Sequence, residues 1–127
     1  MTHPHKAHTG VQRIVRAAGY SVAGLSAAWR HESAFRQECV LAVLMLPAAW
    51  WLGRSWTETV LLAGSVVLVL IVELLNSAVE SAVDRVSADL HPLSKRAKDL
   101  GSAAVMLALL GCAAIWCVAL WQRWSAA

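Results

Sequence analysis

The chain has 127 residues, of which 58% are hydrophobic and 15% are charged, and its formal net charge is +3. This length allows one small domain, and the charged fraction lies well below the average of about 25% for soluble domains. The composition argues against a nucleic-acid-binding protein, because the sequence contains no separate basic module. It favours a chain that places its apolar surface in lipid, with a compact soluble three-helix core as the alternative.

The N-terminal stretch MTHPHKAHTG is polar and contains His3, His5 and His8. Chain ends of this kind are usually poorly ordered. Residues 1–10 are therefore predicted to form a disordered tail rather than a metal site, and residues 11–127 are predicted to form one membrane domain.

Residues 11–31 show the apolar spacing of an amphipathic helix, with Arg13, Arg16 and Arg30 outside the apolar stripe. Such a helix is predicted to lie on the membrane surface, with its basic side chains reaching lipid phosphates. A helix packed against a protein partner is the alternative. The stripe consists of Val11, Ile14, Val15, Ala18, Val22, Leu25 and Trp29.

Three apolar segments follow, at about 34–52, 59–82 and 101–121. The last one contains no charged residue, and its length suffices to cross about 30 Å of hydrocarbon at 1.5 Å per residue. The predicted fold is therefore an all-α membrane protein, with an N-terminal amphipathic surface helix and three transmembrane helices per subunit.

The basic residues predict the orientation of these spans. Of the 11 lysines and arginines, only Arg54 and Arg123 lie outside the segments before the first span and between the second and third spans. The positive-inside rule then places the N-terminus and the 83–100 loop in the cytoplasm. Tryptophans at the opposite ends of the spans fit an aromatic belt at the other membrane surface. They are Trp50, Trp51, Trp56, Trp121 and Trp124.

The second span ends in IVELLNSAVESAVDR, where Glu73, Asn76, Glu80 and Asp84 share one helix face. Carboxylates facing lipid are costly, so this face is predicted to line a protein interior or a crevice shared between subunits. Glu73 lies about 15 Å deeper than Asp84 at 1.5 Å per residue, which makes it a poor ion-pair partner for the loop and a functional candidate. Close helix approach is predicted along the small residues Gly101, Ser102, Ala104, Ala108 and Gly111.

Glu32 and Glu38 lie where the first span enters the membrane on the same side, and Lys95, Arg96 and Lys98 follow the second span. Carboxylates hold Mg²⁺ together with substrate phosphates, and basic side chains bind phosphate oxygens. The arrangement suits phosphoryl transfer from a soluble donor to a lipid hydroxyl. The sequence has neither a P-loop nor protein-kinase motifs, so its nucleotide site would belong to an unrelated fold. A small proton-coupled transporter, which would also use a membrane glutamate, is the alternative from another class.

The stretches ELLNSAVESAVDR, RAKDLGSAAV and AAWRHESAFRQE closely resemble the bacterial integral-membrane diacylglycerol kinase family, over nearly the whole chain from Arg13 onward. Pro92 and Lys95 depart from the family's usual loop. The resemblance implies a homotrimer in the bacterial inner membrane, with composite active sites at subunit boundaries. It also implies transfer of the γ-phosphoryl group of MgATP to diacylglycerol, which gives phosphatidic acid. An undecaprenol kinase of the same fold is the alternative.

The resemblance also implies roles for individual residues. Glu73 would be the general base for the lipid hydroxyl, Glu32 and Glu80 would hold the divalent ion at the ATP phosphates, and Asn76 would orient Glu73 or the metal shell. Further contacts to the nucleotide would come from Arg13, Tyr20, Asp89, Leu90, His91, Lys98 and Asp99. The lipid would lie along Ala18, Gly19, Ser21, Trp29, Ala34, Arg36, Glu38, Ser102 and Trp116.

Overall fold

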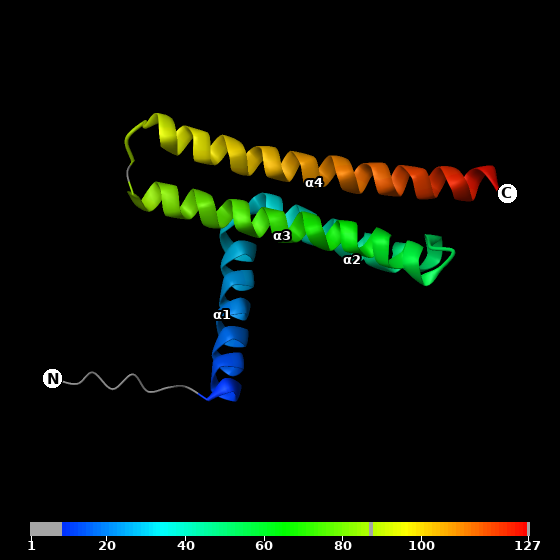
Figure 1. The fold of residues 1–127 in the computed structure, drawn as a ribbon, viewed down its shortest axis with the longest axis horizontal. Coiled ribbons are helices and arrows are strands. Elements are labelled where there is room, and N and C mark those ends of the chain that lie inside the picture. Colours follow the sequence, from blue (N-terminus) through cyan, green and yellow to red (C-terminus); the bar gives the residue numbers. More distant parts are fainter. Residues whose placement is uncertain (1–8, 87, 127) are drawn as a thin grey trace.

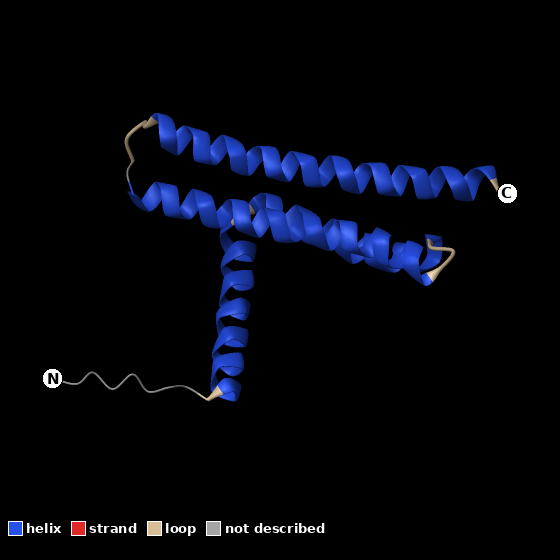
Figure 2. Cartoon of the chain, in the orientation of Figure 1, coloured by secondary structure: helices blue, strands red, loops and turns tan. Residues whose placement is uncertain are grey.

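The computed structural model describes residues 9–86 and 88–126, and every element in these ranges is an α-helix (Figure 2). Three long helices run side by side, whereas the first helix projects steeply away from them (Figure 1). The predicted tail falls mostly on residues 1–8, which lie outside the described part of the chain. The helices are α1 (Gly10–His31), α2 (Ser33–Leu52), α3 (Trp56–Val86) and α4 (Pro92–Ser125).

The first helix, α1, has almost the bounds that its amphipathic pattern predicts. Ala28 near its C-terminal end is its one buried residue, and apolar side chains such as Val11 and Ile14 are 72% and 70% exposed. The rest of the chain therefore leaves the apolar stripe uncovered, as expected of a helix whose apolar face meets a lipid surface or another protein.

An elbow at Glu32 joins α1 to α2. The Glu32 backbone is extended, with φ −115° and ψ 105°. Arg36 Nη1 donates hydrogen bonds to the carbonyls of Trp29, at 2.8 Å, and Arg30, at 3.2 Å. The last carbonyls of a helix have no partner within it, so Arg36 of α2 caps the end of α1 and holds the elbow.

The core of the bundle lies where α3 packs against α4 and α2. The indole Nε1 of Trp116 donates to the Leu62 carbonyl at 3.3 Å and to Ser65 Oγ at 3.2 Å. These buried hydrogen bonds join α4 to α3 inside an otherwise apolar contact. The buried residues of the core are Ala42, Ala49, Leu52, Leu62, Val66, Trp116 and Ala119.

Two of the three predicted spans lie on helices that are long and apolar enough to cross a membrane. The best windows of α3 and α4 have mean hydropathies of 2.3 and 2.5. The helix of the first predicted span, α2, does not meet the same criterion among the described residues, and it carries Arg36 and Glu38 near its start. Large apolar side chains such as Val43 and Leu110 are 71% and 59% exposed, which fits a lipid-facing bundle better than a soluble core.

The segment predicted as a loop over 83–100 is largely helical. α3 continues to Val86, and α4 already begins at Pro92. His91 is the N-cap of α4, and its Nδ1 accepts a hydrogen bond from the Leu93 N–H at 3.1 Å. Proline is favoured in the first turn because it lacks an N–H and has a helical φ. Lys95 and Lys98 are thus held on the first turns of a rigid helix.

Candidate active site

Glu73 is 6% exposed and lies among three other carboxyl groups. Its carboxyl interacts electrostatically with those of Glu80 and Glu32 and shares a side-chain hydrogen bond with Glu38. Glu32 comes from the elbow, Glu38 from the start of α2, and Glu80 from two turns farther along α3. The structure therefore brings together the predicted base, both predicted metal ligands and one predicted lipid contact.

The acidic cluster consists of Glu32, Glu38, Glu73 and Glu80. One buried oxygen of this cluster and one of the neighbouring Asn76 have no hydrogen-bond partner among the described residues. They are Glu38 Oε2 and Asn76 Oδ1. The Asn76 amide donates to Glu80 Oε1 at 3.4 Å. A buried polar group without a partner costs about 1–3 kcal/mol. An ion, a water molecule or a substrate bound beside Glu38 and Asn76 would supply the missing contacts.

Gly101 of α4 lies directly against Asn76 of α3. A Cβ atom at Gly101 would overlap Asn76 Oδ1. Glycine therefore allows α4 to approach α3 at the level of the acidic cluster, as predicted for the small residues of the third span. At Gly111, farther along the same helix, an added Cβ would meet open space, with no atom of another element within 4 Å.

The donor set of the cluster fits Mg²⁺. Hard carboxylate oxygens suit this ion, which usually uses one or two carboxylates together with substrate phosphates. In the described ranges, no group of three or more His, Cys, Asp or Glu side chains is arranged to hold a metal. Glu32 and Glu80 carry carboxylate oxygens of the kind that Mg²⁺ prefers.

A pocket of about 950 Å³ lies between the end of α3 and the start of α4, and its wall begins at Val83 and Asp84, about one helical turn beyond Glu80. Lys98 pairs with Asp84 at 2.7 Å, and Lys95 pairs with Asp99 at 2.6 Å. Lys98 donates to Asp84 and Lys95 donates to Asp99, and these hydrogen bonds raise the pKa of both lysines, which are protonated at neutral pH. Lys98 also interacts with Glu80, which connects the pocket to the acidic cluster. The predicted nucleotide contacts on its wall are Asp89, Leu90, His91, Lys98 and Asp99.

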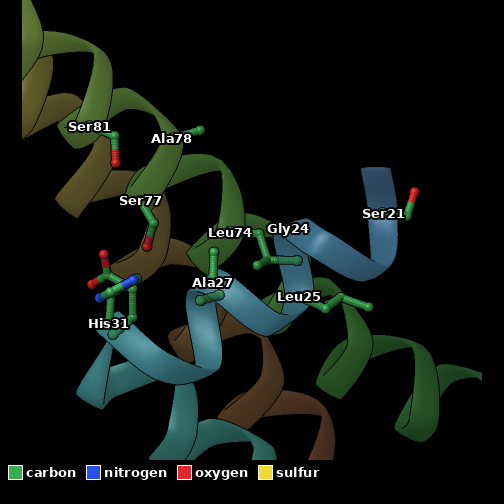
Figure 3. A pocket seen from close by; sticks show the side chains of 11 residues that line it. Ser21, Gly24, Leu25, Ala27, His31, Leu74, Ser77, Ala78 and Ser81 are labelled. Atoms are coloured by element: carbon green, nitrogen blue, oxygen red, sulfur yellow. The ribbon is translucent and has the colours of Figure 1, made fainter. Parts of the chain in front are cut away.

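A second pocket, of about 550 Å³, lies between α1 and α3 (Figure 3). Glu32 is the one member of the acidic cluster that lines it. The Ser77 and Ser81 hydroxyls are turned toward the side where His31 lies, whereas the Ser21 hydroxyl points away and bonds the Ala17 carbonyl at 2.9 Å.

Several predicted site residues lie away from the acidic cluster in a single subunit. Arg13, Ala18, Gly19 and Tyr20 lie on the exposed outer turns of α1. Trp116 is buried against Ser65, which is about 12 Å along α3 from Glu73 at 1.5 Å per residue. The remaining predicted lipid contacts divide between the elbow and α4. Trp29, Ala34 and Arg36 lie at the elbow, and Ser102 is exposed on α4.

Three side chains that line the pocket between α1 and α3 are absent from the set of predicted site residues. They are His31, Ser77 and Ser81. The four-residue spacing of the serines places both on one side of the acidic face of α3. His31 gives no such signal, because its position depends on the angle of the elbow.

The chain is similar to proteins of known family. A family model described as "Prokaryotic diacylglycerol kinase" matches residues 19–120. A diacylglycerol kinase of Escherichia coli (strain K12) is 52% identical over 92% of this chain and 96% of its own length. One from Pseudomonas aeruginosa is 52% identical over 89% and 92%, and one from Helicobacter pylori is 42% identical over 84% of each chain.

Proposed function

Because the chain belongs to the prokaryotic diacylglycerol kinase family, we propose that it transfers the γ-phosphoryl group of MgATP to diacylglycerol and forms phosphatidic acid. The observation that carries this proposal is the position of Glu73. Its carboxyl is buried among other carboxyl groups on a helix apolar enough to cross a membrane, and Lys98 connects that cluster to a pocket at the helix ends.

The reaction needs one proton acceptor and one phosphate-binding region. The lipid hydroxyl oxygen attacks the γ-phosphorus, the bond from that phosphorus to the β–γ bridging oxygen breaks, and ADP leaves. The hydroxyl proton passes to a carboxylate oxygen of Glu73. Lys98 exchanges its partner Asp84 for a phosphate oxygen, because a protonated amine pairs well with either anion. Catalysis then rests on positioning and charge neutralisation, as phosphoryl transfer generally requires.

Glu32 and Glu80 are the residues that would hold the divalent ion. When bound, the ion neutralises charge on the transferring phosphates. Asn76 supports this arrangement, since its amide donates to Glu80 and its own oxygen still lacks a partner.

The proposed setting is the bacterial inner membrane, with the N-terminus and the connection between α3 and α4 in the cytoplasm. The distribution of basic residues supports this orientation. A homotrimer is proposed because one chain leaves apolar faces of α3 and α4 exposed and leaves Arg13 and Tyr20 away from the acidic cluster. Neighbouring subunits would then complete each site.

A product assay tests the activity. The purified protein in detergent is supplied with labelled ATP and, separately, with diacylglycerol or undecaprenol. Labelled phosphatidic acid is expected, and undecaprenol should remain unlabelled. Labelled undecaprenyl phosphate in its place would establish the other lipid kinase. Absence of both products, together with proton-coupled uptake in proteoliposomes, would establish a transporter.

A further inference from the structure

Two arginines at the end of the bundle far from the acidic cluster join its helices. Arg54, between α2 and α3, donates from Nη2 to the Gln122 carbonyl of α4. Arg123 of α4 donates from Nη1 to the Trp51 carbonyl of α2 at 3.2 Å. Each guanidinium thus bonds the segment that carries the other arginine, which places both positive charges at the same end of the bundle.

Tryptophans surround these arginines. The Arg123 guanidinium carbon lies 3.7 Å from the centre of the Trp51 ring, and Trp50 packs edge-on against Trp56 with ring centres 5.0 Å apart. Trp51 and Trp56 are 66% and 72% exposed. Exposed indoles at the ends of apolar helices are typical of the headgroup region of a bilayer, so this end is placed at the depth of lipid phosphates.

The charge of this end is positive and partly uncompensated. Glu58 is the one acidic residue within 47–72 and 100–127, and its Oε2 accepts the Arg54 backbone N–H at 2.7 Å. A guanidinium carries five N–H donors, and the contacts above occupy few of those on Arg54 and Arg123. Arg54 and its neighbours are exposed, so the remaining donors can reach the lipid headgroups.

We propose that Arg54 and Arg123 form a binding site for the phosphate of an anionic phospholipid in the leaflet opposite the acidic cluster. Each guanidinium carries a permanent positive charge that attracts a phosphate group, and the indoles hold the site at headgroup depth. The bound lipid lies across the α2–α3 turn and the end of α4. This role does not depend on the proposed kinase activity.

Tryptophan quenching by brominated lipids tests the proposal, because five of the seven tryptophans lie at this end. The protein is reconstituted in phosphatidylcholine vesicles that contain a minor fraction of either brominated phosphatidylglycerol or brominated phosphatidylcholine. Stronger quenching by the anionic lipid is expected. The protein's preference for the anionic lipid over phosphatidylcholine should fall about fivefold for each arginine removed, since one arginine near an anionic surface contributes about 1 kcal/mol.

Three double variants distinguish binding at these two arginines from the effects of total charge and of the contacts between helix ends. R54Q/R123Q should lose the preference, whereas R54K/R123K should keep most of it, because lysine retains the charge but not the guanidinium contacts to the carbonyls. R30Q/R85Q removes two positive charges at the other end and should keep the preference. Thermal melting followed by circular dichroism checks that each variant is folded.

Three results would overturn the proposal. They are a preference that persists in R54Q/R123Q, an equal loss in R30Q/R85Q, and a loss in R54K/R123K as complete as in R54Q/R123Q. The last would mean that helix-end contacts, and not charge, determine the lipid preference.

Discussion

The charged groups at the two ends of the bundle have different surroundings. Near the elbow, carboxyl groups crowd around Glu73, and two buried oxygens lack partners. At the far end, Arg54 and Arg123 bond backbone carbonyls, and Arg123 also lies over an indole ring. Buried groups without a partner cost stability, so a chain keeps them where a ligand completes them. The two arginines instead join helices through backbone carbonyls and keep their remaining donors at the exposed end of the bundle. Substitutions at the first end should therefore change activity, and substitutions at the second end should leave it unchanged.

The largest effect is expected for Glu73→Gln. It replaces the proposed base with an amide of similar shape, so turnover should fall by about 10³-fold, within the range for general-base catalysis. ATP affinity and oligomeric state should stay nearly constant. Labelled-lipid production measures turnover, and nucleotide binding is measured separately.

Glu58→Gln is the matched control, because it makes the same change on the same helix at the far end. Its activity should equal that of the wild type, since the amide oxygen can still accept the Arg54 N–H. Turnover of Glu73→Gln within tenfold of the wild type would exclude Glu73 as the base.

Glu80→Ala should have the next largest effect, on the metal dependence. Loss of one proposed ligand is expected to raise the Mg²⁺ concentration for half-maximal ATP binding by about 10- to 100-fold. Titration of ATP binding against Mg²⁺ measures this change. Val79→Ala, on an exposed neighbouring position, serves as the control. An unchanged Mg²⁺ requirement in Glu80→Ala would remove it from the metal site.

Gly101→Ala tests the contact between α3 and α4 at the acidic cluster. The new Cβ overlaps Asn76 Oδ1, so the side chain or the helix must shift, at a cost of about 1–3 kcal/mol. Thermal unfolding should show the loss of stability, and activity should fall with it. Gly111→Ala meets open space and should leave stability unchanged or raise it by up to about 1 kcal/mol, because alanine has the higher helix propensity. Equal effects from both substitutions would contradict the proposed close approach.

The smallest effect is expected for Lys98→Gln, whose side chain is partly exposed. The KM for ATP should rise about fivefold, at the upper end for an exposed charge pair, with a smaller change in kcat. Lys95→Gln should stay within about twofold, because its pair with Asp99 lies on the open surface. A larger rise in the KM for ATP in Lys95→Gln than in Lys98→Gln would mean that Lys95, and not Lys98, contacts the phosphates.

The helices could be predicted from the sequence, but their full lengths could not. The amphipathic stripe places α1 within one residue at its N-terminus, because its period is regular. The spans 59–82 and 101–121 are shorter than α3 and α4, since hydropathy detects the lipid-buried part only. α4 continues through polar sequence to its cap at His91 and Pro92. His91 and Pro92 form a helix start that can be recognised in the sequence. The prediction of a loop over 83–100 does not take this signal into account.

The candidate site was likewise predictable only in part, because some of its contacts depend on how the helices pack. The common face of Glu73, Asn76 and Glu80 follows from helical spacing alone. The contact between Glu38 and Glu73 depends on how α2 is rotated against α3, and the position of Glu32 depends on the elbow that Arg36 caps. Spacing within one helix does not determine either quantity. The reach of Arg54 to Gln122 is equally a tertiary property.

The elbow at Glu32 has one mechanical consequence. α1 has 22 residues, which corresponds to a lever arm of about 33 Å. A tilt of about 10° around this pivot would carry the free end of α1 through about 6 Å, while Glu32 would hardly move. A change in the tilt of α1 would therefore displace Arg13 and Tyr20 far more than the carboxyl group of Glu32.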